Sequence, residues 1–452
     1  MAPELIASTD NRVVVGLGAT GLSCARYLHG LGLKFSVVDT RDEPPGLAQL
    51  RAQMPDVPVY TGECPQDIVT GASELVVSPG IALDAPLVRQ ALDAGVTVIG
   101  DIDLFMREAQ VPVVGITGSN AKSTVTELVG QMARDAGLDV GVGGNLGTPA
   151  LDLLSPTREL YVLELSSFQL ERAGHLDLAV ATVLNISADH LDRHGNMPAY
   201  HQAKHRIFRG CRAAVMNPDD ALTVPLVPPD VELVSWRMGE PDLGGFGLRV
   251  VDGEEYLCRG FENIMPVADL AMAGRHNVRN ALAALALGNC VGLSVARMAQ
   301  TLARFRGLPH RCEPVGEIRG VRFVNDSKGT NIGATVAALS GLADGRNIVL
   351  IAGGQGKGAD FTELAPAVRQ HCRAAVLMGE DADAMAAALA ETCTLLRAGC
   401  MDDAVVLAAA EARPGDTVLL SPACASFDMF SGYEERGEMF CTAVSRLNGV
   451  AQ

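Results

Sequence analysis

Short apolar runs that end in glycine, serine or aspartate recur along the whole chain. Near the start, VVV at 13–15 leads into GLGATG, the helical stretch LSCARYLHGLG follows, and KFSVV then ends at Asp39. The runs LVVSPG at 75–80 and VTVIG at 96–100 continue this spacing. Strands that alternate with helical stretches predict an α/β domain. We place its end at residue 100.

Two further series of the same kind follow. The second has VPVVGITG, YVLELSS at 161–167, LAVATVLNIS at 178–187 and the helical patterns NVRNALAALALG and VARMAQTLARF. Residues 217–260, rich in Pro, Gly and Asp, predict a β-rich insertion within it. The third has VRFVNDS at 321–327, NIVLIAGG at 347–354, AAVLMGE at 374–380 and TVLLSPA at 417–423. We place the boundary between these two series at residue 307.

The predicted fold class is therefore α/β with three domains, which agrees with a length of 452 residues at ~150 residues per domain. We expect a Rossmann-like domain over 1–100, a central P-loop ATPase-type domain over 101–307 and a second Rossmann-like domain over 308–452. Ligands are expected beyond the carboxyl ends of the strands.

Composition narrows the possible partners. A net charge of −17 disfavours nucleic acid or an anionic membrane surface. The most apolar stretch, 281–293, is too short to span a bilayer and predicts a buried helix. The eleven cysteines form no CxxC pair, and MAPELIASTDNR at the start predicts no secretory signal. We expect a cytoplasmic monomer.

The loop GLGATG at 16–21 follows a strand and opens a helix. With Asp39 at the end of the next strand, it predicts binding of a nucleotide diphosphate, because loop amides attract the anion and the carboxylate accepts from ring or ribose groups. A redox dinucleotide fits the loop equally well, and a packing turn without any ligand is the third alternative.

The loop GITGSNAKST at 115–124 resembles a phosphate-binding loop with one glycine replaced. Its amides are expected to face phosphate, Lys122 to neutralise the outer phosphates, and Ser123 or Thr124 to offer Mg²⁺ a hydroxyl. Ala121 stands at the replaced position. If that position needs a positive φ, its Cβ costs ~1–2 kcal/mol, which weakens the loop without abolishing it.

Three further polar side chains of the second series fit a metal-bound nucleotide. Glu164 ends a strand, and Asp189 and His190 lie just past the next one. Taken singly, a solvated glutamate and a structural histidine are the plainer interpretations. Lys204, on a helix between Tyr200 and Phe208, is either a surface lysine or a lysine whose lowered pKa makes it a nucleophile.

Three loops of the third series, NDSKGTN at 325–331, GGQGKG at 353–358 and SPACAS at 421–426, follow predicted strands. Each could be an ordinary turn. Together, with two of them bearing lysine, they match what a small carboxylate substrate requires.

Ordered over almost the whole length, these motifs resemble the Mur ligase family of peptidoglycan synthesis. The resemblance rests on GLGATGLS with VVDTR, GITGSNAKST, GGNLGTPAL, LELSSFQLE, NISADHLDRH, HNVRNALAA, GLPHRCE, NDSKGTN, GGQGKGADF and SPACASFD. It implies an ADP-forming ligase in which ATP phosphorylates a carboxylate and an amine then displaces the phosphate. Within the family, the outer motifs resemble members that add D-glutamate to UDP-N-acetylmuramoyl-L-alanine.

The resemblance also implies roles for individual residues. It assigns to ATP Gly118, Ser119, Asn120, Ala121, Lys122, Ser123, Thr124, Asn277, Asn280, Arg311 and Asp326. It implies two Mg²⁺ sites held by Ser123, Glu164, His190 and Lys204, the lysine as a carbamate formed with CO2. The residues implied as catalytic are Lys122, Glu164, His190 and Lys204.

The two other substrates are assigned in the same way. The resemblance implies a UDP-substrate site formed by Gly18, Ala19, Thr20, Asp39, Thr40, Ser78, Pro79, Gly80 and Asn145. It implies a D-glutamate site formed by Lys328, Thr330, Lys357, Ser426 and Phe427. Ala121 departs from the family pattern, which has glycine there.

Other functions stay open at this point. Sister ligases for L-alanine, a diamino acid or a dipeptide share the central motifs, although SPACASFD stands where a diamino-acid ligase would carry Asn-Pro-Arg. The folate-polyglutamating relatives lack an N-terminal glycine-loop domain of this type. A nicotinamide dehydrogenase or a nonenzymatic nucleotide sensor would leave GITGSNAKST, Glu164 and Lys204 without a role.

Overall fold

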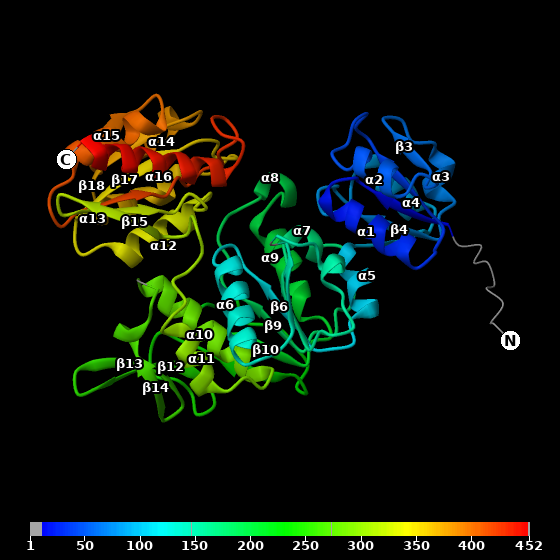
Figure 1. The fold of residues 1–452 in the computed structure, drawn as a ribbon, viewed down its shortest axis with the longest axis horizontal. Coiled ribbons are helices and arrows are strands. Elements are labelled where there is room, and N and C mark those ends of the chain that lie inside the picture. The colour runs from blue at the N-terminus through cyan, green and yellow to red at the C-terminus, as the bar shows by residue number, and fades with distance from the viewer. Residues whose placement is uncertain (1–10, 146, 273, 451–452) are drawn as a thin grey trace.

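The computed structural model describes residues 11–145, 147–272 and 274–450, so residues 1–10 of the stretch considered for a secretory signal lie outside it. Figure 1 shows three α/β units, with the N-terminal and C-terminal units on opposite sides of a central one. Every strand expected from the apolar runs is present. The α/β class with parallel sheets is thus confirmed, whereas the boundaries at 100 and 307 stay a prediction.

The N-terminal sheet is entirely parallel, with strand order β3-β2-β1-β4-β5. Its strands are β1 (Arg12–Val15), β2 (Phe35–Asp39), β3 (Val59–Thr61), β4 (Glu74–Val77) and β5 (Thr97–Ile99). Its helices are α1 (Ala19–Gly30), α2 (Leu47–Gln53), α3 (Gln66–Thr70) and α4 (Pro86–Asp93). Because β2 and β4 flank β1 and lead away in opposite directions, the crevice for a ligand opens at the carboxyl ends of β1 and β4.

The central sheet is also parallel, with order β11-β10-β9-β6-β8-β7. Its strands are β6 (Val113–Thr117), β7 (Val140–Gly144), β8 (Leu160–Glu164), β9 (Val180–Val183), β10 (Ala213–Met216) and β11 (Glu232–Ser235). The helices of this unit are α5 (Asp101–Glu108), α6 (Lys122–Asp135), η1 (Ala150–Leu153), α7 (Ser167–Leu170), α8 (Leu191–His194), α9 (Met197–His205), η2 (Arg206–Phe208), η3 (Val267–Asp269), α10 (Arg275–Cys290) and α11 (Val295–Leu302). The connections after the neighbouring strands β6 and β9 lead to opposite sides of the sheet. The switch point therefore lies at the carboxyl end of β6, where the predicted phosphate loop begins.

The β-rich insertion is real but shorter than expected. Its antiparallel sheet comprises β12 (Phe246–Val251), β13 (Glu254–Arg259) and β14 (Glu262–Pro266). The first part of the predicted segment instead contributes β11, which extends the central parallel sheet. The apolar helix α10 is buried against α6, and no helix among the described residues is long and apolar enough to cross a membrane.

The C-terminal sheet has order β15-β16-β20-β17-β18-β19, parallel except for the edge strand β15. Its strands are β15 (Glu313–Ile318), β16 (Val321–Asn325), β17 (Ile348–Gly353), β18 (Cys372–Met378), β19 (Thr394–Arg397) and β20 (Thr417–Leu420). Its helices are α12 (Ile332–Leu342), η4 (Phe361–Leu364), α13 (Ala365–His371), α14 (Ala382–Ala388), α15 (Met401–Glu411) and α16 (Tyr433–Val450). The three polar loops predicted from the third series therefore follow the carboxyl ends of the neighbouring strands β16, β20 and β17.

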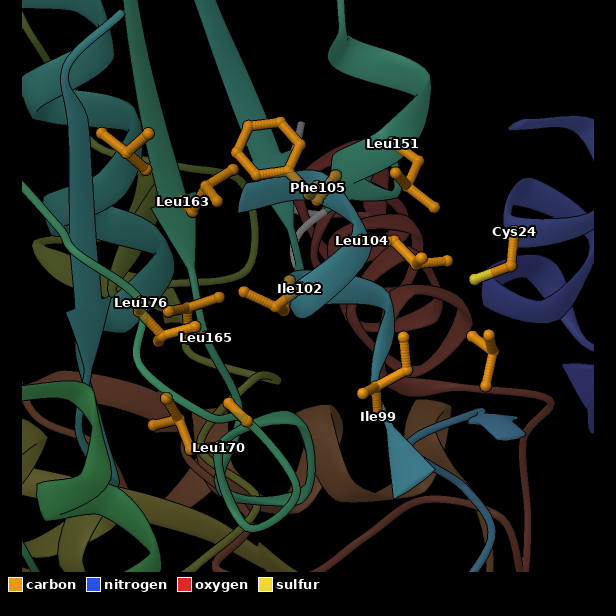
Figure 2. Close-up of a cluster of buried hydrophobic side chains, with 14 of the residues drawn as sticks. Cys24, Ile99, Ile102, Leu104, Phe105, Leu151, Leu163, Leu165, Leu170 and Leu176 are labelled. Atoms are coloured by element: carbon orange, nitrogen blue, oxygen red, sulfur yellow. The ribbon is translucent and has the colours of Figure 1, made fainter. Parts of the chain in front are cut away.

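One hydrophobic core joins the N-terminal and central units. Helix α5 lies between them, with Ile102 and Phe105 in the same buried cluster as Cys24 on α1 and Leu163 on β8 (Figure 2). Side chains of η1 complete the contact with α1. Because closely packed apolar surfaces resist displacement, this core holds the two units in a defined relative position.

Candidate functional site

The phosphate loop runs from the end of β6 to the first turn of α6. Gly118 has φ 156° and Ala121 has φ 66°, so Ala121 does occupy the left-handed region. Lys122 folds back over the loop, and its Nζ donates to the carbonyl oxygens of Gly118 and Ser119, both at 2.9 Å. The loop is thereby wrapped around a lysine at the positive end of a helix, an arrangement that binds phosphate.

The segment after β9 supports this loop from one side. Asn120 N donates to Asn185 Oδ1 at 2.8 Å, and Asn185 Nδ2 donates back to the Asn120 carbonyl at 3.0 Å. Ser119 Oγ bonds to the Ser187 carbonyl and to the hydroxyl of Tyr200, each at 3.0 Å. These bonds keep the loop in shape. Asn185 and Ser187 were not predicted as site residues.

Glu164 ends β8 beside the loop and is only 3% exposed. Its Oε1 accepts from Asn145 Nδ2 at 2.7 Å, whereas Oε2 is buried without a hydrogen-bond partner among the described residues. Burial works to raise the pKa of Glu164, but Lys122, Ser123 and Asn145 together hold it below its ordinary value. An ionised carboxylate with a free oxygen is a suitable ligand for Mg²⁺.

Asp189 and His190 follow β9 as predicted, and His190 has φ 53°. Burial favours a higher pKa for Asp189, but His190, Lys357 and Lys122 lower it, so the carboxylate is ionised. Burial lowers the pKa of His190, which keeps its imidazole neutral and able to bind a metal.

Lys204 is buried, with 1% of its surface exposed, and so is not a surface lysine. Its Nζ donates to the Gly118 carbonyl at 2.7 Å and lies 4.7 Å from the centre of the Tyr200 ring. Burial and the nearby charge of Lys122 lower its pKa well below the ordinary value. The lowered pKa favours the neutral amine of Lys204 beside the phosphate loop.

Three side chains of the C-terminal unit reach the phosphate loop or the segment after β9. Arg311 Nη2 donates to Ser123 Oγ at 2.6 Å. Asn331, the N-cap of α12, donates from Nδ2 to Asn120 Oδ1 and Asp189 Oδ2, both at 3.1 Å. Lys357 Nζ lies 3.6 Å from Asp189 Oδ1. Asn331 was not predicted as a site residue, because its partners belong to another unit.

A cavity of about 670 Å³ lies between the central and C-terminal units. The central unit contributes Asn120, Ala121, Thr124, Trp236, Asn277 and Asn280 to its lining. The C-terminal unit contributes Arg311, Asp326 and Lys328. Its size suits a nucleotide, since small-molecule sites commonly have 300–1,000 Å³. Asn280 Nδ2 donates to Asn277 Oδ1 at 3.0 Å, which fixes the orientation of this amide pair.

The N-terminal glycine loop is the second candidate site, at the switch point beside β1. Gly16 has φ 91°, and a Cβ on Gly21 would lie 1.8 Å from the Gly16 carbonyl oxygen, so both positions require glycine. Asp39 accepts from Leu17 N at 2.7 Å and from Arg41, which leaves its carboxylate largely occupied within the loop. Ser78 Oγ donates to the Gly16 carbonyl at 2.9 Å.

The remaining residues predicted for the UDP-linked substrate gather around this loop. Gly18 caps α1, and Ala19 and Thr20 form its first turn. Thr40 directly follows β2, and Ser78, Pro79 and Gly80 directly follow β4. Asn145, in contrast, lies at the end of β7 in the central unit, bonded to Glu164 as described above.

In the C-terminal unit the three polar loops do converge. Arg436, 2% exposed, donates to Ser327 Oγ and to the carbonyl oxygens of Ser327, Cys424 and Ala425. This arginine was not predicted, because all its partners are backbone or hydroxyl groups of distant loops. Arg436 ties the loop that carries Thr330 to the loop that carries Ser426, and Gln355 N of the third loop donates to the Ala425 carbonyl at 3.1 Å.

The predicted D-glutamate residues differ in their surroundings. Lys328 Nζ lies 3.7 Å from the centre of the Tyr433 ring, and burial together with Arg311 lowers its pKa to about 8. Ser426 is buried, whereas Phe427 is 71% exposed. Lys357 has φ 53° and points to Asp189.

The Asp326 side chain is largely buried, so little of it is exposed for contact with a bound molecule. Its oxygens accept from Ser421 Oγ at 2.7 Å and Cys312 N at 3.2 Å, and burial raises its pKa to about 6. It nevertheless lines the large cavity.

No three His, Cys, Asp or Glu side chains come together as a metal cluster in the described part of the chain. The donors beside the phosphate loop include the unpartnered oxygen of Glu164, the hydroxyl of Ser123 and the imidazole of His190. Mg²⁺ takes one or two protein ligands together with phosphate oxygens and water, so this donor set fits it.

Comparison with known proteins decides the family. Three family models match in order: Mur ligase MurD-like, N-terminal domain, at residues 10–100; Mur ligase middle domain at 116–288; and Mur ligase, glutamate ligase domain, at 310–424. The chain belongs to the Mur ligase family. The motifs quoted above lie in all three matched segments, so the resemblance inferred from them is confirmed.

Curated relatives match over essentially the whole length. UDP-N-acetylmuramoylalanine--D-glutamate ligase of Pseudomonas syringae pv. syringae is 55% identical over 448 residues, which cover 98% of this chain and all of the relative. The ligase of the same name from Pseudomonas aeruginosa is 55% identical over 447 residues, with the same coverage.

Solved structures share the three-domain fold at low identity. MurF ligase from Thermotoga maritima, solved in complex with ADP, has a TM-score of 0.59 at 15% identity and covers 97% of this chain and 96% of its own. UDP-N-acetylmuramate-alanine ligase from the same organism has a TM-score of 0.56 at 17% identity and covers 98% and 99%.

Proposed function

We propose that this protein is an ATP-dependent, ADP-forming ligase that joins D-glutamate to UDP-N-acetylmuramoyl-L-alanine in the synthesis of peptidoglycan precursors. The observation that carries this proposal is the cavity between the central and C-terminal units, which has a phosphate loop on one wall and basic residues of the C-terminal unit on the other. The names of the curated relatives support the choice of substrates.

The chemistry follows from where the charges lie. The γ-phosphate of ATP would lie against Lys122, and the alanine carboxylate of the UDP-linked substrate would attack it to form an acyl phosphate and ADP. Lys122 and Arg311 would balance the negative charge that builds up on the transferring phosphoryl group. Phosphoryl transfer of this type depends on positioning, so a covalent protein nucleophile is not needed.

The second half-reaction uses the C-terminal loops. Lys328 and Lys357 would bind the two carboxylates of D-glutamate, with Thr330, Ser426 and Phe427 around them. The amine of D-glutamate would attack the acyl carbon and displace inorganic phosphate, losing a proton as the amide bond forms. Two lysines on separate loops suit a dicarboxylate better than a monocarboxylate such as alanine.

Mg²⁺ at Glu164, Ser123 and His190 would neutralise phosphate oxygens and orient the γ-phosphate for attack. We further propose that Lys204 carries a carbamate that supplies additional oxygen ligands. Its neutral amine would add to CO2 and release one proton, leaving an anion beside Lys122. The carbamate places a negative charge close to the Lys122 cation, which favours the conversion of the neutral amine electrostatically.

The location and assembly state belong to the same proposal. All eleven cysteines are unpaired, which suits a reducing cytoplasm. We propose a cytoplasmic monomer whose substrates are small molecules, with no role for nucleic acid or a membrane.

Phosphate release with MgATP, UDP-N-acetylmuramoyl-L-alanine and a set of amino acids tests this function. Release that depends on both D-glutamate and the UDP-linked substrate is the expected result. Release with L-alanine, a diamino acid or a dipeptide would indicate a sister ligase. Release without any amino acid would indicate an ATPase or a nucleotide sensor, and either outcome overturns the proposal.

A further inference from the structure

Arg172 extends from the end of α7 in the central unit to the loop after β4 in the N-terminal unit. Its Nη1 donates to the carbonyl oxygens of Val77 at 2.9 Å and Ser78 at 2.6 Å. Its Nη2 donates to the Ile81 carbonyl at 2.9 Å and lies 3.4 Å from that of Pro79. One guanidinium thus donates to four backbone carbonyl oxygens within residues 77–81. We call this segment the β4 loop.

The side chain is built into this position. Its exposed fraction is 0%, and its Nε donates to the Phe168 carbonyl at 2.9 Å. A Cβ at Gly100 would lie 3.0 Å from Arg172 Cγ, so the absence of a side chain there makes room for the arginine stem. A buried guanidinium needs a full set of acceptors, and the β4 loop supplies most of them.

A second arginine contacts the same loop from α8. Arg193 Nη2 donates to the Ile81 carbonyl at 3.0 Å, and Glu171 pairs with both arginines. The Arg193 guanidinium also lies 4.9 Å from the centre of the Phe168 ring, which in turn lies 4.9 Å from the His190 ring. The cluster therefore joins the β4 loop to the segment that bears the proposed metal ligand.

The β4 loop in turn shapes the glycine loop. Ser78 Oγ donates to the Gly16 carbonyl, and a Cβ at Gly16 would lie 3.0 Å from Ser78 Cβ and 3.2 Å from Ile81 Cγ1. A shift of the β4 loop of about 1 Å would therefore change the shape of the glycine loop, which is the proposed site of the nucleotide diphosphate.

We propose that Arg172, assisted by Arg193, is a positioning residue for the UDP-linked substrate: it holds the β4 loop in the shape that binds the uridine diphosphate portion. This inference rests on the proposed function only in its choice of that substrate. Arginine is required because lysine cannot present a planar fork of donors to several carbonyl oxygens at once.

The test combines Arg172→Ala, Arg172→Lys and Arg193→Ala with a matched control, Arg26→Ala. Arg26 also bridges the N-terminal and central units, through a 2.5 Å contact with Asp152, but does not touch the β4 loop. The first readout is calorimetric binding of uridine diphosphate alone, which needs no ligase activity. The second is the KM for each of the three substrates with kcat.

Both Arg172 variants should weaken uridine diphosphate binding and raise the KM for the UDP-linked substrate by about tenfold. The KM values for ATP and D-glutamate should change little, Arg193→Ala should give a smaller change in the same direction, and Arg26→Ala should match the wild type. If the Arg172 variants fold poorly, Arg193→Ala and amide hydrogen exchange of the β4 loop give the decision.

Three results would overturn the inference. These are wild-type affinity in Arg172→Ala, full recovery in Arg172→Lys, or equal losses in Arg193→Ala and Arg26→Ala. Wild-type protein that binds uridine diphosphate but forms no amide with D-glutamate would refute the proposed function and leave the binding comparison decisive. Wild-type protein that does not bind uridine diphosphate would refute both.

Discussion

Replacing Ala121 by glycine should stabilise the protein, although it removes a methyl group. Ala121 has φ 66° and ψ −2°, and its side chain makes no cap bond to α6. An L-residue in the left-handed region costs about 1–2 kcal/mol. Glycine avoids that cost but adds about 0.4–1 kcal/mol of chain entropy to the unfolded state. The net gain for Ala121→Gly is therefore about 0.5–1 kcal/mol.

Scanning calorimetry can measure this effect. For a unit of the size of the central one, a gain of about 0.5–1 kcal/mol corresponds to a rise in Tm of roughly 1–4 °C. The KM for ATP should stay the same or fall, because the loop keeps its shape. The matched control is Ala136→Gly at the other end of α6, where φ is −76°. There glycine should lower the stability by about 0.5–1 kcal/mol.

The two variants remove the same methyl group at the two caps of one helix, and the sign of φ is opposite at the two positions. Opposite shifts in Tm are the expected result. If Ala121→Gly lowers Tm as Ala136→Gly does, the left-handed conformation carries no cost at this position, and the reasoning from φ is refuted. The departure from the family pattern would then have no energetic consequence.

Three more outcomes are expected. Because burial raises the pKa of Asp326 from 3.8 to about 6, its ionised form destabilises the fold by about 3 kcal/mol above pH 6. Asp326→Asn should therefore raise stability by up to about 3 kcal/mol there, melting curves should show the gain fading towards pH 4, and activity should fall. Lys328 loses its charge near pH 8, so the KM for D-glutamate should rise between pH 7 and 9 more steeply in the wild type than in Lys328→Gln. Lys204→Ala should lower kcat by roughly a hundredfold, with partial rescue by acetate or formate; an unchanged rate would exclude the carbamate role.

The sequence predicted best the features that are local along the chain. The phosphate loop, its strand and its helix are consecutive, and the glycine loop at 16–21 is as well. The strand β7 was missed because VGVGG carries three glycines and little apolar periodicity. The segment before the antiparallel insertion was misjudged for a similar reason: the short run ELVS in β11 has no pattern that distinguishes a parallel edge strand from an insertion strand.

The supporting residues of the site could not be predicted in the same way. Asn331 bonds to Asn120 and Asp189, which precede it by 211 and 142 positions. Arg436 bonds to carbonyl oxygens, which every residue type offers. A sequence records which donors exist, but it does not record which distant backbone they reach. Functional groups that lie close together along the chain can therefore be predicted from the sequence. The contacts between units can be identified only from the structure.

Backbone strain marks the same places. Ten non-glycine residues of the described chain have positive φ, and six of them lie in the loops that form or flank the site: Ala121, His190, His310, Cys312, Lys357 and Ala423. Each costs of order 1 kcal/mol and persists only where surrounding contacts impose it. Asn331 of the C-terminal unit bonds to the side chains of Asn120 and Asp189, which directly precede the strained residues Ala121 and His190. Loosening the contact between the central and C-terminal units should therefore relax the strained loops as well. The geometry of the phosphate loop and the position of the C-terminal unit are thus expected to change together.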